Sequence, residues 1–150
     1  MTIHDVSLKE WLKSGVDYTL VNENNLLPSV LDSITATDLV GMDTEFVAED
    51  CYQPDLCLLQ LATREAVYII DPRTIDDIGA IWRLLVDPQR TVIVHAGREE
   101  ILFANRATGA PIPKLFDVQV AVGLLGGEYP ASYGKLLQRL VGETVPKGET

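Results

Sequence analysis

The most constraining feature of the sequence is an apolar stretch that ends in two carboxylates, LVGMDTEF at residues 39–46. Its apolar start predicts a short buried strand. Successive side chains of a strand point to opposite faces, so Asp43 and Glu45 would project together, away from Met42 and Thr44. Like charges held side by side are costly unless a cation or hydrogen bonds compensate. The stretch therefore predicts either a site for Mg²⁺ or Mn²⁺, which prefer oxygen ligands, or two solvated acids at a strand end.

Length and composition are those of one folded domain spanning residues 1–150. Hydrophobic residues make up 47% of the chain and charged residues 23%, which is ordinary for a globular protein. No apolar run approaches the roughly 20 residues of a membrane span. The first fifteen residues lack the apolar core of a signal peptide, so we expect a cytoplasmic protein without membrane contact. Cys51 and Cys57 are spaced like neither a zinc knuckle nor a redox pair.

The net charge of −10 argues against a passive nucleic-acid binder, which would normally carry a basic patch. It does not exclude a metal-dependent nuclease, because in such enzymes carboxylates hold the cations that meet the phosphate.

Periodicity predicts a mixed α/β arrangement. The alternating stretch at 16–21 indicates an edge strand, and five further strands are predicted to form a mixed sheet, at 38–45, 56–62, 66–70, 91–95 and 115–116. Helices are predicted near residues 8–12, from the polar break at 22–25 to Ala36, and at 75–86, 98–108, 118–125 and 132–141. Helices would flank the sheet, and a ligand site is expected at the strand ends that carry Asp43, Glu45 and His95.

A second motif, VHAGREEILF at residues 94–103, places Glu99 and Glu100 in the first turn of a helix. Acids are favourable there because they oppose the helix dipole, so both glutamates could be capping charges and His95 a polar residue at a strand end. A ligand role for Glu100 is the alternative. That alternative gains weight because a neighbouring strand also ends in acids.

These motifs, taken in order, carry a family resemblance. Residues 39–46, followed by Tyr52-Gln53-Pro54 and LLQL at 58–61, resemble the first motif of the ribonuclease D-like 3′–5′ exonucleases. These enzymes form part of the DEDD family, in its tyrosine branch. Residues 94–103 resemble the second motif, and LFDVQ at 115–119 with residues 133–141 resembles the segment that follows it. The resemblance covers about residues 17–150.

The resemblance implies a ribonuclease H-like fold and hydrolysis of nucleic acid from a 3′ end with two Mg²⁺ or Mn²⁺ ions. It implies that Asp43 bridges both ions, that Glu45 binds one and faces the attacking water, and that Glu100 supports the second ion. For Asp117, a structural role is expected. Single-stranded RNA is favoured over DNA by the resemblance alone, because contacts to the 2′-hydroxyl have no motif here. No organic cofactor is implied.

The sequence departs from the family pattern at two points. Glu100 stands where the family has an aspartate, and its additional methylene would shift or weaken the second ion. The third motif, a tyrosine with an aspartate four residues later, is absent, since neither Tyr129 nor Tyr133 has that partner. We therefore expect a C-terminally incomplete exonuclease domain that is weakly active or inactive alone.

Three alternatives compete with this interpretation. The first is a non-catalytic module of the same fold that binds nucleic acid or a protein. The second is a nucleotide-binding α/β protein, which would need a glycine-rich turn after its first strand, whereas Phe46-Val47-Ala48 follows Glu45. The third is a glycosidase, whose two carboxylates would face each other across the substrate and not lie two residues apart on one strand.

Overall fold

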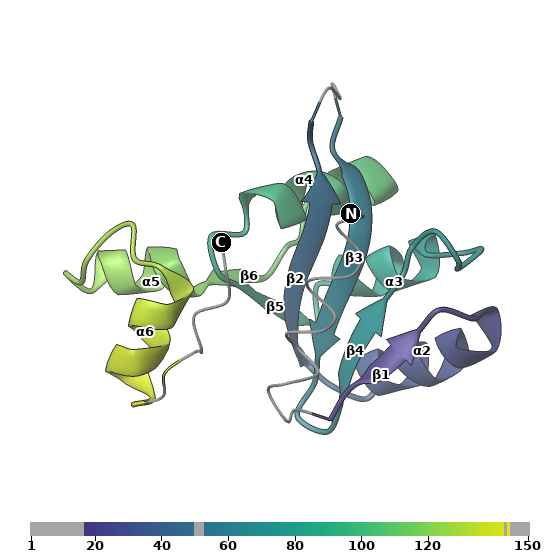
Figure 1. Ribbon diagram of the computed structural model, residues 1–150, viewed down its shortest axis with the longest axis horizontal. Helices are drawn as coiled ribbons and strands as arrows, with labels where there is room; N and C mark the ends of the chain where they lie inside the picture. Colours follow the sequence, from purple (N-terminus) through teal and green to yellow (C-terminus); the bar gives the residue numbers. More distant parts are fainter. Residues whose placement is uncertain (1–16, 50–52, 143, 145–150) are drawn as a thin grey trace.

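The computed structural model describes residues 17–49, 53–142 and 144 (Figure 1). Its centre is a six-stranded sheet in the order β1-β4-β3-β2-β5-β6. The strands are β1 (Thr19–Val21), β2 (Leu39–Val47), β3 (Asp55–Ala62), β4 (Val67–Ile70), β5 (Thr91–Val94) and β6 (Leu115–Asp117). The helix predicted near residues 8–12, and Cys51 and Tyr52 of the motifs, lie outside the described residues.

The sheet is mixed, as predicted. Strand β3 runs antiparallel to both of its neighbours, β2 and β4, whereas β1 pairs with β4, β5 with β2 and β6 with β5 in parallel. The predicted five-stranded sheet is wrong in number, because the stretch at 16–21, predicted as an edge strand, pairs with the other five and makes six strands in the described chain. The additional strand is β1, which joins the sheet at its edge because Val21 is fully buried and pairs with Ile70.

Three helices cover one face of the sheet: α2 (Leu27–Thr35), α3 (Gly79–Leu85) and α4 (Arg98–Thr108). Their apolar faces pack on the inward side chains of the strands, of which Val40, Leu59 and Val92 are fully buried. A short 3₁₀ turn, η1 (Asn24–Leu26), precedes α2, and Pro28 lies in the first turn of that helix, where its missing N–H costs nothing.

Helix α3 is shorter than the predicted 75–86 and begins only at Gly79. The late start is explained by a side chain from a distant part of the sequence, that of Asn24. Asn24 accepts a hydrogen bond from the backbone N–H of Asp76 at 2.9 Å and donates to the Asp76 carboxylate at 2.8 Å, and this holds the preceding residues as a turn. A tertiary contact therefore overrides the apolar periodicity.

Two further helices, α5 (Val118–Leu124) and α6 (Tyr133–Leu140), follow β6. In Figure 1 they lie to one side of the sheet, apart from the layer of α2, α3 and α4. Large apolar side chains in this part of the chain are exposed, and Leu124 and Leu125 are 83% and 88% exposed. Among the described residues, no helix is long and apolar enough to cross a membrane.

Candidate active site

The acidic end of β2 has the alternation predicted from the sequence. Met42 and Thr44 are buried on the helix-covered face, whereas Asp43 and Glu45 project from the opposite, open face. The pairing of β2 with β3 is irregular between Glu45 and Phe46, directly beside these acids. Such irregularities bend a strand and change the direction of its side chains, and they are common next to active sites.

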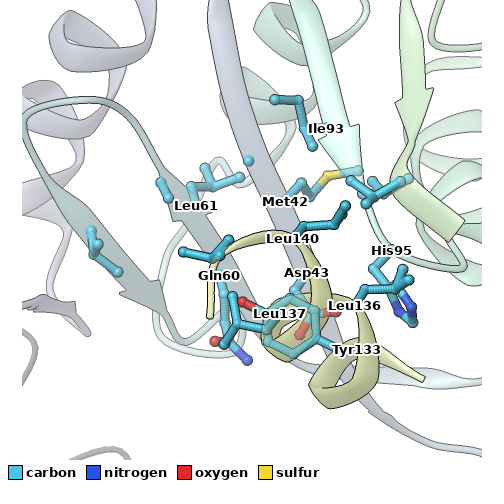
Figure 2. Close-up of a pocket in the computed structure, with 16 residues that line it drawn as sticks. Met42, Asp43, Gln60, Leu61, Ile93, His95, Tyr133, Leu136, Leu137 and Leu140 are labelled. Atoms are coloured by element: carbon cyan, nitrogen blue, oxygen red, sulfur yellow. The ribbon is translucent and has the colours of Figure 1, made fainter. Parts of the chain in front are cut away.

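A pocket of about 440 Å³ opens beside Asp43. One side is formed by the open face of the sheet, with Gln60 and His95 next to Asp43, and the other side by α6 (Figure 2). The side chains that α6 contributes are Tyr133, Leu136, Leu137 and Leu140. The site therefore combines one carboxylate with a largely apolar wall, which is the usual composition of a small-ligand pocket.

The charges of the two strand carboxylates are poorly compensated. Burial against the pocket walls raises the pKa of Asp43, although the backbone N–H of Thr44 and the charge of His95 lower it in part. Burial also raises the pKa of Glu45, and repulsion by Asp43 and Glu100 adds to this rise. A cation bound between Asp43 and Glu45 would relieve both effects, so this pair fits a hard divalent ion.

The third candidate ligand, Glu100, comes from a different element, but its charge is close enough to raise the pKa of Glu45. It is only 6% exposed, in the first turn of α4, and its Oε1 accepts a hydrogen bond from the Thr44 hydroxyl at 2.6 Å. Thr44 faces the helix layer, so the Glu100 carboxylate is held by the side chain that lies between Asp43 and Glu45 in the sequence. Within the described part of the chain, no group of three or more histidine, cysteine, aspartate or glutamate side chains is arranged to hold a metal ion.

Asp117, expected to be structural, organises the chain around the site. Its carboxylate accepts hydrogen bonds from the backbone N–H groups of Ala96 and Gly97 after β5, and from those of Gln119 and Val120 at the start of α5. Desolvation opposes its ionisation, but these four bonds together lower the pKa of Asp117. One side chain thus caps α5 and fixes the turn between β5 and α4.

Replacing Asp117 with asparagine should lower the free energy of unfolding at pH 7 by about 1.5 kcal/mol, allowing for solvent screening. A lowered pKa means that this stabilisation is present above the unfolded-state pKa and is lost as the pH falls through the folded-state value. Urea unfolding at pH 7 and at about pH 3 should therefore show the difference from wild type shrinking at the lower pH. Asp32→Asn, an exposed change on α2, is the matched control, and an Asp117→Asn effect no larger than the control's would contradict this role.

Sequence reasoning placed His95 at the same strand ends as Asp43 and Glu45 but gave it no specific role, and it missed Gln119. His95 follows Ile93 by two positions, and Ile93 pairs with Gly41, which shares a face with Asp43. Strand parity alone could therefore have placed His95 next to Asp43. Gln119 had no such signal, because its role depends on the loop before α6.

Comparisons with known proteins agree with the resemblance seen in the motifs. A family model described as 3′–5′ exonuclease matches residues 18–150. The ribonuclease D of Desulfotalea psychrophila is 32% identical over 132 residues, which are 87% of this chain and 35% of that protein. The ribonuclease D of Escherichia coli is 30% identical over 136 residues, covering 90% of this chain and 36% of the relative. The chain thus spans about a third of the length of these curated relatives.

Solved structures show the same relationship. The crystal structure of Escherichia coli RNase D, described as an exoribonuclease involved in structured RNA processing, superposes with a TM-score of 0.82 at 28% identity. It covers 89% of this chain and 36% of that structure. This superposition confirms the predicted ribonuclease H-like α/β architecture. The family model accounts for nearly the whole chain, and we conclude that the chain belongs to the 3′–5′ exonuclease domain family, with ribonuclease D-like relatives.

Proposed function

We propose that this domain removes nucleotides from the 3′ end of single-stranded RNA by metal-dependent hydrolysis. The observation that carries the proposal is the pair of poorly compensated carboxylates, Asp43 and Glu45, at the open end of β2 beside a pocket, in a chain of this family. The relatives named ribonuclease D support RNA as the substrate.

In the proposed reaction, water adds to the terminal phosphodiester and the bond from phosphorus to the 3′ oxygen of the penultimate nucleotide breaks. The products are a nucleoside 5′-monophosphate and an RNA that is one residue shorter. Bound divalent ions, Mg²⁺ or Mn²⁺, would supply charge stabilisation to the phosphoryl oxygens and lower the pKa of water. Asp43 and Glu45 would hold these ions, and the apolar wall of α6 would limit the access of bulk water.

Glu100 is proposed as the third acidic ligand, as the family resemblance implies. The Thr44 hydroxyl occupies one acceptor position on Oε1, so the carboxylate can keep this bond while its other oxygen binds an ion. The hydrogen bond fixes the orientation of the carboxylate, and with the additional methylene of glutamate this is a physical reason to expect weaker binding of the second ion than the family's aspartate would give.

The direct test is hydrolysis of a 5′-labelled single-stranded RNA with Mn²⁺. We expect a ladder of labelled products shortened one nucleotide at a time, and release of nucleoside 5′-monophosphates. A circular RNA of the same sequence is the matched control, because it offers no 3′ end. Because a chain without the third motif is expected to be weakly active, the linear RNA is followed at high protein concentration. Cleavage of the circle, or the absence of any hydrolysis of the linear RNA under these conditions, would reject the proposal. A DNA of the same sequence measures the preference for RNA.

Mn²⁺ should raise the melting temperature of the wild-type chain by about 5 °C at saturation, since an ion that binds only the folded state stabilises it. In Glu45→Gln this rise should be nearly lost.

In the absence of metal, the pKa of Glu45 is higher in the folded chain than in the unfolded chain. The contribution of Glu45 to stability is therefore fully present below the unfolded-state pKa and is lost as the pH rises through the folded-state pKa.

Glu45→Gln without metal should therefore be at least as stable as wild type at pH 7, with a smaller difference near pH 4. Thermal melts with and without Mn²⁺ at both pH values check this, and Glu65→Gln in the β3–β4 turn is the control. An unchanged response to Mn²⁺ in Glu45→Gln would exclude Glu45 as a ligand.

A second candidate function is a non-catalytic interaction module of the same fold. It is favoured because the described residues contain no group of three or more histidine, cysteine, aspartate or glutamate side chains placed to hold a metal ion, and because Leu124 and Leu125 are exposed. For such a module, Mn²⁺ should change the melting temperatures of wild type and Asp43→Ala equally. For the metal-dependent enzyme, Mn²⁺ should raise the melting temperature of wild type only, so this titration separates the two functions.

A further inference from the structure

A single backbone carbonyl in the loop before α6 accepts hydrogen bonds from two side chains. His95 Nε2 and Gln119 Nε2 each lie 2.9 Å from the oxygen of Ala131, and Ala131 is only 1% exposed. A carbonyl oxygen cannot donate, so His95 Nε2 carries a proton in this contact. We call this arrangement the Ala131 bracket. It satisfies a buried backbone acceptor whose loss of partners would be costly.

The bracket links the sheet to the segment that leads into α6. His95 follows β5 and belongs to the sheet, whereas Ala131 lies two residues before α6, which is placed to one side of the sheet in Figure 1. The imidazole of His95 also meets the ring of Tyr133, at the start of α6, edge to face with centroids 5.7 Å apart. Both contacts therefore act on the N-terminal end of the helix that forms the pocket wall.

The two donors are themselves held by one carboxylate. Asp117 accepts hydrogen bonds from the N–H groups of Ala96 and Gly97, directly after His95, and from the N–H of Gln119. The side chains of His95 and Gln119, which come from two different sequence motifs, are thus both directed at the carbonyl oxygen of Ala131. Side chains whose backbone is fixed in this way lose little additional freedom on making the bond.

We propose that His95 and Gln119 are positioning residues that set the α6 wall opposite Asp43. The wall consists of Tyr133, Leu136, Leu137 and Leu140, and Figure 2 shows Tyr133 and Leu137 nearest Asp43, with Leu136 by His95 and Leu140 by Met42. The role for substrate rests on the proposed function, because the wall would contact the terminal nucleotide of the RNA. The bracket itself is a property of the folded chain and can be tested without catalysis.

Hydrogen–deuterium exchange of the folded chain is the first test. Gln119→Leu is the cleaner variant, because Gln119 is uncharged and does not line the pocket. We expect amide exchange in residues 132–141 to accelerate about fivefold, the net effect of one hydrogen bond, with exchange in β2 and β5 within about twofold of wild type. Gln138→Leu makes the same chemical change on the exposed side of α6 and should leave the exchange of both regions unchanged.

His95 supplies an independent pair of variants. His95→Phe keeps an aromatic ring but removes the donor, and should accelerate exchange in α6 as Gln119→Leu does. His95→Gln keeps a donor and should restore part of the protection. The double variant His95→Phe/Gln119→Leu should exceed the product of the single effects, because the buried carbonyl then has neither donor.

The positioning role would be overturned if amide exchange in α6 of Gln119→Leu were as slow as in wild type. It would also be overturned if exchange in β2 and β5 accelerated as much as exchange in α6.

For RNA hydrolysis, Gln119→Leu should raise KM about fivefold and leave kcat within about twofold, because the wall contributes equally to ground-state and transition-state binding. If Gln119→Leu accelerates amide exchange in α6 but leaves KM unchanged, the α6 wall does not contribute to binding of the terminal nucleotide. Failure of the wild-type chain to hydrolyse RNA would reject the proposed function, while the exchange pattern would still decide whether the bracket positions α6.

Discussion

Asp43→Asn should reduce RNA hydrolysis by at least about 1000-fold while the chain remains folded. A metal ion supplies several kcal/mol of transition-state charge stabilisation, and every 1.36 kcal/mol corresponds to a factor of ten in rate. Asparagine keeps the shape of aspartate but removes the charge that would hold the ion. The measurement is turnover of the 5′-labelled RNA under saturating Mn²⁺, with Asp38→Asn as the matched control, an exposed acid just before the same strand.

The fold of Asp43→Asn should be intact for an electrostatic reason. Burial raises the pKa of Asp43, so its contribution to stability is present below the unfolded-state pKa and is lost as the pH rises through the folded-state value. At pH 7 the ionised side chain therefore opposes folding when no metal is bound, and its neutral replacement should melt at the same temperature or slightly higher. Unchanged turnover in this variant would exclude the metal mechanism, and a large fall in melting temperature would show that Asp43 has a structural role.

The largest expected effect on stability concerns Arg90, which is buried at 5% exposure. Its Nε lies 3.1 Å from the carbonyl oxygen of Ile34 and 3.2 Å from that of Thr37, and one terminal nitrogen donates to the carbonyl of Leu84 at 2.6 Å. The guanidinium thus joins the C-terminal ends of α2 and α3, where helix carbonyls have no partner within the helix. The nearest carboxylate, that of Asp87, is 4.0 Å away.

Arg90→Met should lower the free energy of unfolding by about 3 kcal/mol, because methionine fills a similar volume but leaves three carbonyls without these donors. For a chain of this size the corresponding fall in melting temperature is about 6–12 °C. Arg83→Met is the control, since Arg83 forms an exposed ion pair with Asp77 and should change stability by less than about 0.5 kcal/mol. Equal effects of the two substitutions would show that the buried hydrogen bonds of Arg90 contribute little.

Some features of the site follow directly from local sequence. The alternation of β2 fixes which side chains share a face, so the pairing of Asp43 with Glu45 and the burial of Thr44 could be predicted from strand geometry. Helix α4 has the predicted bounds, Arg98–Thr108, because acids in its first turn and Gly109 at its C-cap, with φ of 70°, mark both ends.

Other features depend on contacts between distant residues. The set of Asp43, Glu45 and Glu100 stays a prediction as a metal site, and the hydrogen bond that fixes the Glu100 carboxylate comes from Thr44, 56 residues away in the sequence. The late start of α3 depends on Asn24, which lies 52 residues before its partner Asp76. No local pattern encodes such partners, since a side-chain hydrogen bond requires only that two groups meet in space.

The sequence by itself determined the mixed sheet, the helices of the covered face and the position of the acidic pair, because strand and helix periodicities are local properties of the chain. Only the tertiary structure decided the number of strands, the partner of Glu100 and the convergence of His95 and Gln119 on the carbonyl of Ala131. Those outcomes depend on which loops and helices pack against one another. The physical reason is that burial forces polar groups to find partners, and the partner is whichever group the packed chain brings within reach.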